Sequence, residues 1–152
     1  MRIEYRAFIG QYDWGFTQQQ VGIIRCEDTT GIMAIDMDTN TTVGACIFDN
    51  WSANSVQTHF MITSPLVLKH GFLETCFEYV FGVEGKAIMY GQVPSNNTKA
   101  LKLNKHMGFT EKCVLEGAYA PNVDYIIMEM RKENCRYYHE VIDETEQQRG
   151  AA

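Results

Sequence analysis

The side chain best suited to acid–base chemistry is His59, which lies in the apolar run from Val56 to Thr63. A histidine can take up or release a proton near neutral pH, so one beside a cleft can serve as a general base. The alternative is a half-buried histidine hydrogen-bonded to backbone, and the sequence leaves both interpretations open. The sequence shows no spacing typical of a metal site, so we predict no bound metal.

Composition argues against several classes of function. The formal net charge of −6 disfavours nonspecific binding to nucleic acid, which needs a basic surface. No apolar run reaches the roughly 18 residues that cross a membrane, and the residues after Met1 lack the apolar core of a signal peptide. The five cysteines include no Cys-x-x-Cys pair, which indicates reduced, mostly buried thiols of a cytosolic protein. A catalytic cysteine is the alternative.

The elements that would hold such residues in place alternate between strands and helices. Apolar and alternating runs predict strands, and a 3.6-residue periodicity predicts helices. A short helix is expected to begin at Thr17, after a loop over residues 11–16. This order favours an α+β fold in which helices pack on a mixed sheet. We expect strands at 1–9, 31–37, 42–49, 56–63, 87–93, 110–115 and 123–130, a loop at 116–122 and a helix over 66–81.

Residues 91–109 predict a strand, a capped helix and a stop. Pro94 ends the strand because proline cannot donate to a sheet ladder. Residues 95–97 are Ser-Asn-Asn, which are good N-caps, and Gly108 stands where a helix is expected to end. One apolar helical face is formed by Ala100, Leu103 and Met107.

The same stretch carries a sequence motif. Its pattern, Val-x-x-x-Asn-x-x-Ala-x-x-Leu-x-x-x-x-Gly-Phe, resembles the acetyl-coenzyme A binding end of the GNAT N-acetyltransferase superfamily. The resemblance implies the GNAT fold, a mixed, mostly antiparallel sheet splayed into a V, with helices on both faces and the cofactor between two central strands. An ordinary strand–helix–strand connection is the alternative. The motif is filled by Val93, Asn97, Ala100, Leu103, Gly108 and Phe109.

The resemblance assigns contacts with acetyl-coenzyme A to three places. The strand that ends at Thr63 would pair with the pantetheine arm, and Thr63 itself would contact the cofactor. The backbone amides of Met61 and Ile62 would hold the thioester, because main-chain donors stabilise an oxyanion without titrating. In the phosphate loop, residues 68–73, backbone amides at a helix N-terminus would face the pyrophosphate. The loop contacts would come from Lys69, His70, Gly71 and Phe72, and the helix contacts from Asn97, Ala100 and Asn104.

The resemblance also bears on the catalytic groups. Members of the superfamily often place a tyrosine, the proton donor for the leaving thiolate, where this chain has Asn104. An amide cannot act as a general acid, so Tyr119, in the predicted loop before the last strand, is the replacement candidate. His59 would be the base. In the phosphate loop, Leu68 and Leu73 stand where the family pattern has a basic or amide residue and a small one.

Several stretches together resemble the GNAT-like proteins of tailed bacteriophages. The resemblance covers roughly residues 31 to 138 and implies an N-acetyltransferase assignment without identifying the acceptor. The stretches that carry it are residues 48–59, 68–72, 91–101 and 124–136.

We therefore expect a single GNAT-like domain over residues 1–138, followed by a charged, partly disordered tail over residues 139–152. Its expected function is acetyl-coenzyme A dependent transfer of an acetyl group to an amine on a small molecule or protein, in the cytoplasm of the host if a phage encodes it. The alternative is a catalytically inactive binding or virion-associated module with the same fold. We expect no nucleic-acid or membrane partner, and a homodimer is compatible with the resemblance.

Overall fold

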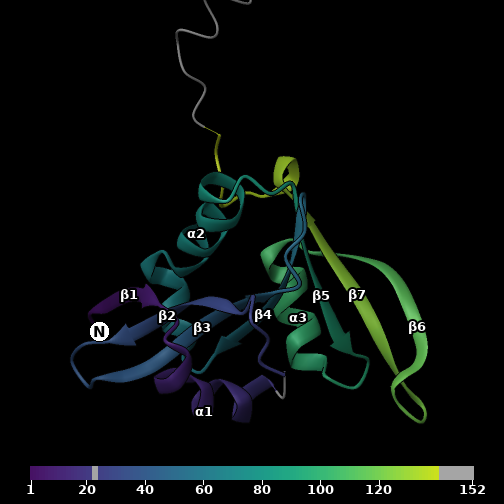
Figure 1. Ribbon diagram of the computed structural model, residues 1–152, viewed down its shortest axis with the longest axis horizontal. Coiled ribbons are helices and arrows are strands. Elements are labelled where there is room, and N and C mark those ends of the chain that lie inside the picture. The colour runs from purple at the N-terminus through teal and green to yellow at the C-terminus, as the bar shows by residue number, and fades with distance from the viewer. Residues whose placement is uncertain (22–23, 141–152) are drawn as a thin grey trace, which may run out of the picture.

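The computed structural model describes residues 1–21 and 24–140, and these form one seven-stranded sheet (Figure 1). The strand order is β1-β2-β3-β4-β5-β7-β6, and β4 with β5 is the one parallel pair among the described residues. The mixed, mostly antiparallel sheet expected from the sequence is therefore confirmed. The strands are β1 (Ile3–Ala7), β2 (Thr30–Asp36), β3 (Thr41–Asp49), β4 (Ser55–Ile62), β5 (Ile88–Pro94), β6 (Thr110–Ala120) and β7 (Val123–Arg131).

Helices cover both faces of the sheet, and Figure 1 shows α1 and α2 on opposite sides of it. One face, here called the α1 face, buries a small cluster of Met33, Ala45, Ile47 and Met61, against which Phe16 packs. The other, the α2/α3 face, buries the larger core, to which α2 and α3 contribute. The helical segments are α1 (Gly10–Val21), η1 (Pro65–His70), α2 (Phe72–Phe77), η2 (Glu78–Val83), α3 (Thr98–Met107) and η3 (Lys132–Asn134).

The first helix begins at Gly10, so the prediction of a loop over 11–16 and a helix start at Thr17 was wrong. The side chain of Asp13 is 3% exposed and accepts hydrogen bonds from the Arg6 guanidinium and the Ile9 amide, each at 2.7 Å. Thr17 lies buried inside the helix. Contacts between the helix and β1 therefore stabilise a segment whose local sequence is a weak helix former.

The predicted helix over 66–81 is present but divided into three segments. The 3-10 helix η1 ends at Gly71, whose φ of 81° is in the left-handed region that favours glycine. The chain then continues as α2 and, over η2, as a wider π-helix. The apolar stripe of Leu73, Cys76, Phe77 and Val80 lies in the core, as its periodicity indicates.

The loop predicted over 116–122 was also wrong, because β6 continues to Ala120. Pairing with β7 is irregular between Leu115 and Ala120, and the chain turns around Asn122, whose φ is 66°. Residues 110–119 are all exposed, so β6 buries no apolar face. Its sequence therefore lacks the apolar alternation from which the full length of the strand could be predicted. Its position at the end of the sheet makes β6 an edge strand.

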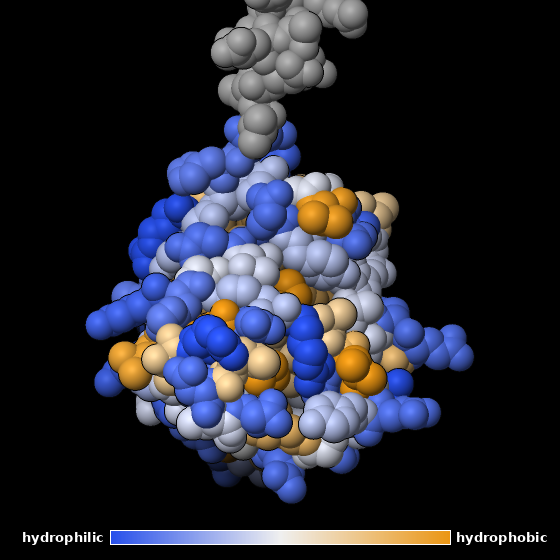
Figure 2. Space-filling model, turned by 90° about the vertical axis from the view of Figure 1, so that its left-hand side faces the viewer, coloured by the Kyte–Doolittle hydropathy of each residue, from blue (hydrophilic) through white to orange (hydrophobic). Residues whose placement is uncertain are grey.

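The C-terminal tail expected from residue 139 lies, from residue 141 on, outside the described residues. No helix among the described residues is long and apolar enough to span a membrane. On the face of the molecule that Figure 2 presents, apolar residues gather in small separate groups among hydrophilic ones.

Candidate functional site

The two central strands separate along their length. β4 and β5 pair only over Ser55–Gln57 and Ile88–Tyr90. Beyond these residues β4 stays paired to β3 as far as Ile62, and β5 to β7 as far as Pro94, so a gap opens between them. The V expected from the sequence is thus confirmed. A cavity of about 640 Å³ is lined by Ile24, Asp49, Gln57, Thr58, His59, Phe60, Gly91, Gln92, Val93, Pro94, Asn97, Ala100, Asn104, Tyr119 and Tyr125.

The edge of β4 that faces the gap offers backbone groups. The Thr63 amide donates to the Val43 carbonyl at 3.0 Å. Because the direction of backbone groups alternates along a strand, the amide of Met61 also faces β3, whereas those of Phe60 and Ile62 face the gap. Of the two backbone donors expected from the sequence, the amide of Ile62 is therefore free to contact a ligand in the gap, whereas that of Met61 is not. The amide of Phe60 is a further donor that was not predicted.

The edge of β5 that faces the gap also offers backbone groups. The amide of Ile88 donates to the Asn54 carbonyl at 3.2 Å, so even-numbered residues of β5 face β4. Gln92 then presents both its N–H and its C=O to the gap. Pro94 is the next residue on this edge, and its lack of an N–H leaves no donor unpaired where β4 has moved away.

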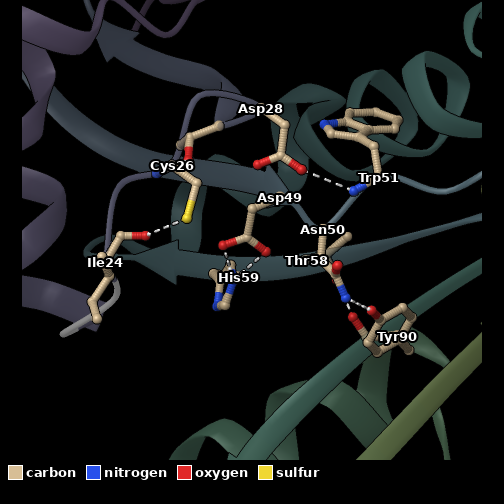
Figure 3. Close-up of polar contacts among 10 residues, drawn as sticks. Ile24, Cys26, Asp28, Asp49, Asn50, Trp51, Thr58, His59 and Tyr90 are labelled. Carbon is tan, nitrogen blue, oxygen red and sulfur yellow. Dashed lines mark hydrogen bonds and ion pairs between the residues drawn. The ribbon is translucent and has the colours of Figure 1, made fainter.

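His59 and Asp49 form a pair at the cavity, as Figure 3 shows. The Nε2 atom of His59 lies 3.0 Å from Oδ1 and 3.1 Å from Oδ2 of Asp49. Their side chains are only 12% and 13% exposed. His59 shares a strand face with Met61, and Asp49 with Ile47, so both belong to the α1 face. The bonding partner of the histidine is thus a carboxylate rather than backbone.

Sequence reasoning missed Asp49, although a signal was present. Residues 50–54 connect β3 with β4, and counting outward from that loop pairs Asp49 with Gln57. An aspartate at position 49 is then a diagonal cross-strand neighbour of His59. Polar contacts hold the loop over 50–54 in place (Figure 3). The backbone amide of Trp51 donates to the Asp28 carboxylate at 3.1 Å, and the side-chain amide of Asn50 donates to the Tyr90 hydroxyl.

The helix α3 brings its three predicted residues to the cavity from the α2/α3 face. Asn97 is the N-cap, and its side-chain oxygen accepts a hydrogen bond from the Ala100 amide at 3.1 Å. Asn104 donates to the Ala100 carbonyl at 2.8 Å. The helix ends at Gly108, whose φ of 103° is left-handed, as the sequence predicts. The cavity is therefore lined by residues of both faces of the sheet.

Tyr119 lies at the cavity from its place on β6, and Tyr125 on β7 lies beside it. Their ring centroids are 5.4 Å apart and their planes meet at 71°, an edge-to-face arrangement. The Tyr119 side chain is 52% exposed. Tyr125 pairs with Pro94 across the β5–β7 ladder, which places it at the open end of the gap. Tyr125 was not foreseen, because nothing local distinguishes it from other strand tyrosines.

The phosphate loop, residues 68–73, does not contribute to the cavity lining among the described residues. Lys69 and His70 are exposed, and the carbonyl of His70 accepts a hydrogen bond from the Tyr5 hydroxyl. Phe72 is fully buried and Leu73 is 2% exposed, both within the larger core. Thr63, also expected to contact the cofactor, is exposed at the end of β4. The bulk of Leu73 therefore points into the core and not into the gap.

The cysteines stand apart from this site. Cys46, Cys76 and Cys135 are buried, and Cys26 and Cys113 are exposed. Burial raises the pKa of Cys46 and of Cys135, which keeps both thiols protonated and unreactive. None of the five lines the cavity, so the geometry does not favour the alternative of a catalytic cysteine.

The arrangement of strands matches solved structures of acetyltransferases. Spermidine/spermine N-acetyltransferase SpeG from Vibrio cholerae aligns with a TM-score of 0.68 at 14% identity, over 86% of this chain and 92% of that one. A protein of Desulfovibrio desulfuricans assigned to the GNAT family aligns with a TM-score of 0.68 at 12% identity, over 86% and 99%. The chain has the GNAT fold. No protein-family model and no curated protein sequence matches it.

A further SpeG structure, in complex with CoA and spermine, aligns with the same GNAT fold at a TM-score of 0.65 and 16% identity, over 87% of this chain and 96% of that one. Identities this low establish the fold alone. The chemistry of this chain must therefore be argued from its own residues.

Proposed function

We propose that the protein is an N-acetyltransferase that transfers an acetyl group from acetyl-coenzyme A directly to an amine. The observation that carries the proposal is the gap between β4 and β5, with unpaired backbone groups on both edges and a His–Asp pair at one side. The similar SpeG structure that holds CoA supports the choice of cosubstrate.

The cosubstrate fits the backbone groups of the gap. The amides of Phe60 and Ile62 and the open edge at Gln92 can hydrogen-bond the amide groups of a pantetheine arm, much as a strand would. Asn97, Ala100 and Asn104 would border the arm from α3. Acetyl-coenzyme A supplies the activated acetyl thioester in this arrangement.

The phosphate loop would lie further along the same edge. Lys69, His70, Gly71 and Phe72 lie where η1 meets α2, after β4 in the chain, and we propose them as the pyrophosphate contacts, with Lys69 adding positive charge. Met61 is withdrawn as a backbone donor because its amide faces β3. Thr63 is proposed as a side-chain neighbour of the arm at the end of β4.

His59 would act as the general base. Asp49 accepts a hydrogen bond from Nε2–H of His59, and this tautomer leaves the lone pair on Nδ1. Nδ1 can then take a proton from the ammonium form of the acceptor. The amine nitrogen bonds to the acetyl carbon, the carbon–sulfur bond breaks, and the sulfur leaves as a thiolate. The hydroxyl of Tyr119 would supply the proton that the thiolate takes up. The second proton that the nitrogen loses on becoming an amide would restore this hydroxyl.

A second candidate is a catalytically inactive module with the GNAT fold, kept by a phage for binding or as part of the virion. Two observations favour it. Asn104 is bonded back to its own helix and cannot act as an acid. Leu68 and Leu73 contribute to the core where the family pattern has residues that admit phosphate. Origin from a tailed phage and action in the host cytoplasm are part of our proposal for either candidate.

Isothermal titration calorimetry with acetyl-coenzyme A separates the two candidates. The enzyme is expected to bind it with a dissociation constant on the order of 1 μM–1 mM. Absence of heat at millimolar acetyl-coenzyme A would contradict the enzyme and leave the inactive module. Binding should also raise the melting temperature, because a ligand that binds only the folded state stabilises it.

A further inference from the structure

The charges around the cavity restrict the acceptor. Among the described residues that line it, Asp49 is the sole carboxylate, and neither lysine nor arginine is present. Asp49 is engaged with His59 through both carboxylate oxygens. The remaining polar lining consists of hydroxyls and of amides such as Gln57 and Gln92, which hydrogen-bond but carry no charge.

This distribution disfavours two kinds of acceptor. A carboxylate or phosphate on the acceptor would lie in the cavity without a cation to pair with. A polyamine would bring a second and a third ammonium group, and Asp49 is the one carboxylate available to meet them among the described lining residues. Taking a charge out of water without a partner of opposite charge is strongly unfavourable, so such acceptors should bind weakly. One ammonium group, delivered to His59, is compatible with the site.

The aromatic rings at the cavity indicate what the rest of the acceptor is. Tyr119 and Tyr125 stand edge to face, and Pro94 lies opposite Tyr125 on the neighbouring strand. These three residues form an angled, largely apolar wall of the cavity, in which the two rings stand steeply to one another. Aromatic side chains pair favourably with other rings in offset or edge-to-face geometry. His59, Tyr125 and Pro94 share the α1 face, so the ring surface and the base lie on the same side of the sheet.

We propose that the acceptor is a monoamine with an aromatic ring and no other charge, its ring held by Tyr119 and Tyr125 and its amine delivered to His59. This inference rests on the proposed acetyl transfer and names the substrate class for that site. In the reaction Nδ1 of His59 receives the ammonium proton, the amine nitrogen bonds to the acetyl carbon and the carbon–sulfur bond breaks. The Tyr119 hydroxyl protonates the leaving thiolate, and the second proton that the nitrogen loses on becoming an amide restores that hydroxyl.

The test uses three probes: 2-phenylethylamine, L-phenylalanine, which adds a carboxylate to the same ring, and spermidine, which carries several ammonium groups. Dissociation constants are measured by calorimetry with and without CoA, and kcat/KM is measured with acetyl-coenzyme A. We expect 2-phenylethylamine to be favoured over both others by at least about tenfold, the factor that 1.4 kcal/mol represents. Equal or stronger binding of spermidine or L-phenylalanine, or no binding of 2-phenylethylamine, would overturn the inference.

Variants of Tyr125 test the ring surface. Tyr125→Ala should weaken binding of 2-phenylethylamine by about tenfold at most, in line with one aromatic contact. Tyr125→Phe keeps the ring and should leave that affinity within about twofold of the original. The affinity for acetyl-coenzyme A serves as the folding control in both. Equal effects of the two substitutions would contradict a role for the ring.

A gain of function tests the charge argument independently. Gln57 pairs with Asp49 across the β3–β4 ladder, so Gln57→Glu adds a second carboxylate beside the first. Spermidine should then gain about fivefold relative to 2-phenylethylamine, corresponding to about 1 kcal/mol for one partly exposed ion pair. No change in this ratio would contradict the argument from charge.

The two proposals fail in different ways. If acetyl-coenzyme A does not bind, the proposed function fails, and amine binding without CoA still decides which class of amine the cavity selects. If acetyl-coenzyme A binds and spermidine is the better acceptor, the proposed function stands and the acceptor class is wrong.

Discussion

Nε2 of His59 lies within 3.1 Å of both carboxylate oxygens of Asp49, on neighbouring antiparallel strands at the cavity between β4 and β5. The pair combines the proposed base with a carboxylate that can orient it, and both side chains are largely shielded from water. A carboxylate in this position fixes which ring nitrogen carries the proton and stabilises the imidazolium after proton transfer.

Replacement of His59 should separate catalysis from cosubstrate binding. His59→Ala is expected to lower kcat by about 100-fold or more, the contribution typical of a general base. The dissociation constant for acetyl-coenzyme A should stay unchanged, because the proposed contacts of the pantetheine arm come from backbone and α3. Steady-state kinetics and calorimetry on the same preparation measure both quantities. Unchanged turnover would remove His59 from the mechanism.

Asp49→Asn should also reduce kcat, because it changes the tautomer of the His59 imidazole and not because it removes a contact with the substrate. An asparagine can donate to Nε2 and thereby favour the tautomer with the proton on Nδ1, the wrong one for a base. We expect a loss of about 10-fold to 100-fold, smaller than or equal to that of His59→Ala. The double variant should be no worse than His59→Ala, since the two residues act as a unit. Additive losses would mean that Asp49 acts independently.

Tyr119→Phe tests the proton donor. The substitution keeps the ring against Tyr125 and removes only the hydroxyl. If the hydroxyl protonates the leaving thiolate, kcat should fall by about 100-fold while KM for the amine changes little. Rates measured with the matched variant Tyr125→Phe provide the control. An equal effect of both substitutions, or none, would show that the thiolate takes its proton from water.

The contact between Arg6 and Asp13 should be visible in the pH dependence of stability. Burial raises the pKa of Asp13, but the hydrogen bonds from the Arg6 guanidinium and the Ile9 amide outweigh it, so its pKa is lowered overall. A carboxyl group with a lowered folded-state pKa stabilises the fold above its unfolded pKa of about 3.9, and loses that contribution as pH falls through the folded value.

Asp13→Asn should therefore cost about 2 kcal/mol of unfolding free energy at pH 7, as expected for a hydrogen bond between charged groups. The difference from the original protein should shrink as the pH is lowered below about 4. Denaturant unfolding at several pH values measures it, and Glu116→Gln, at an exposed position, is the control. A difference independent of pH would show that the substitution acts through packing and not through charge.

Local sequence patterns were sufficient to predict the structure of segments whose conformation depends on residues close by in the chain. Residues 91–109 form the strand, cap, helix and stop that their residue types indicate, because an N-cap, an amphipathic face and a C-terminal glycine act over one or two turns. The hairpin of β2 and β3 and the position of His59 on a strand follow in the same way. The GNAT fold could be inferred because this one segment carries its motif.

Tertiary structure decided the elements whose stability comes from distant partners. Helix α1 begins at Gly10 because Asp13 is bound to β1, and β6 extends to Ala120 through pairing with β7 and not through a buried face of its own. The direction of the Met61 amide depends on the register between β3 and β4, which cannot be predicted from the residues around Met61 alone.

The site shows the same division. His59, Tyr119, Asn97, Ala100 and Asn104 could be named from residue type and motif, and all five line the cavity. Asp49, Tyr125 and Gln92 became apparent only when the strands were paired, because a cross-strand neighbour is set by register and by where β4 and β5 separate. The sequence by itself thus indicated the fold and a histidine suited to act as a base, and the tertiary structure decided what holds that histidine and what surrounds the gap.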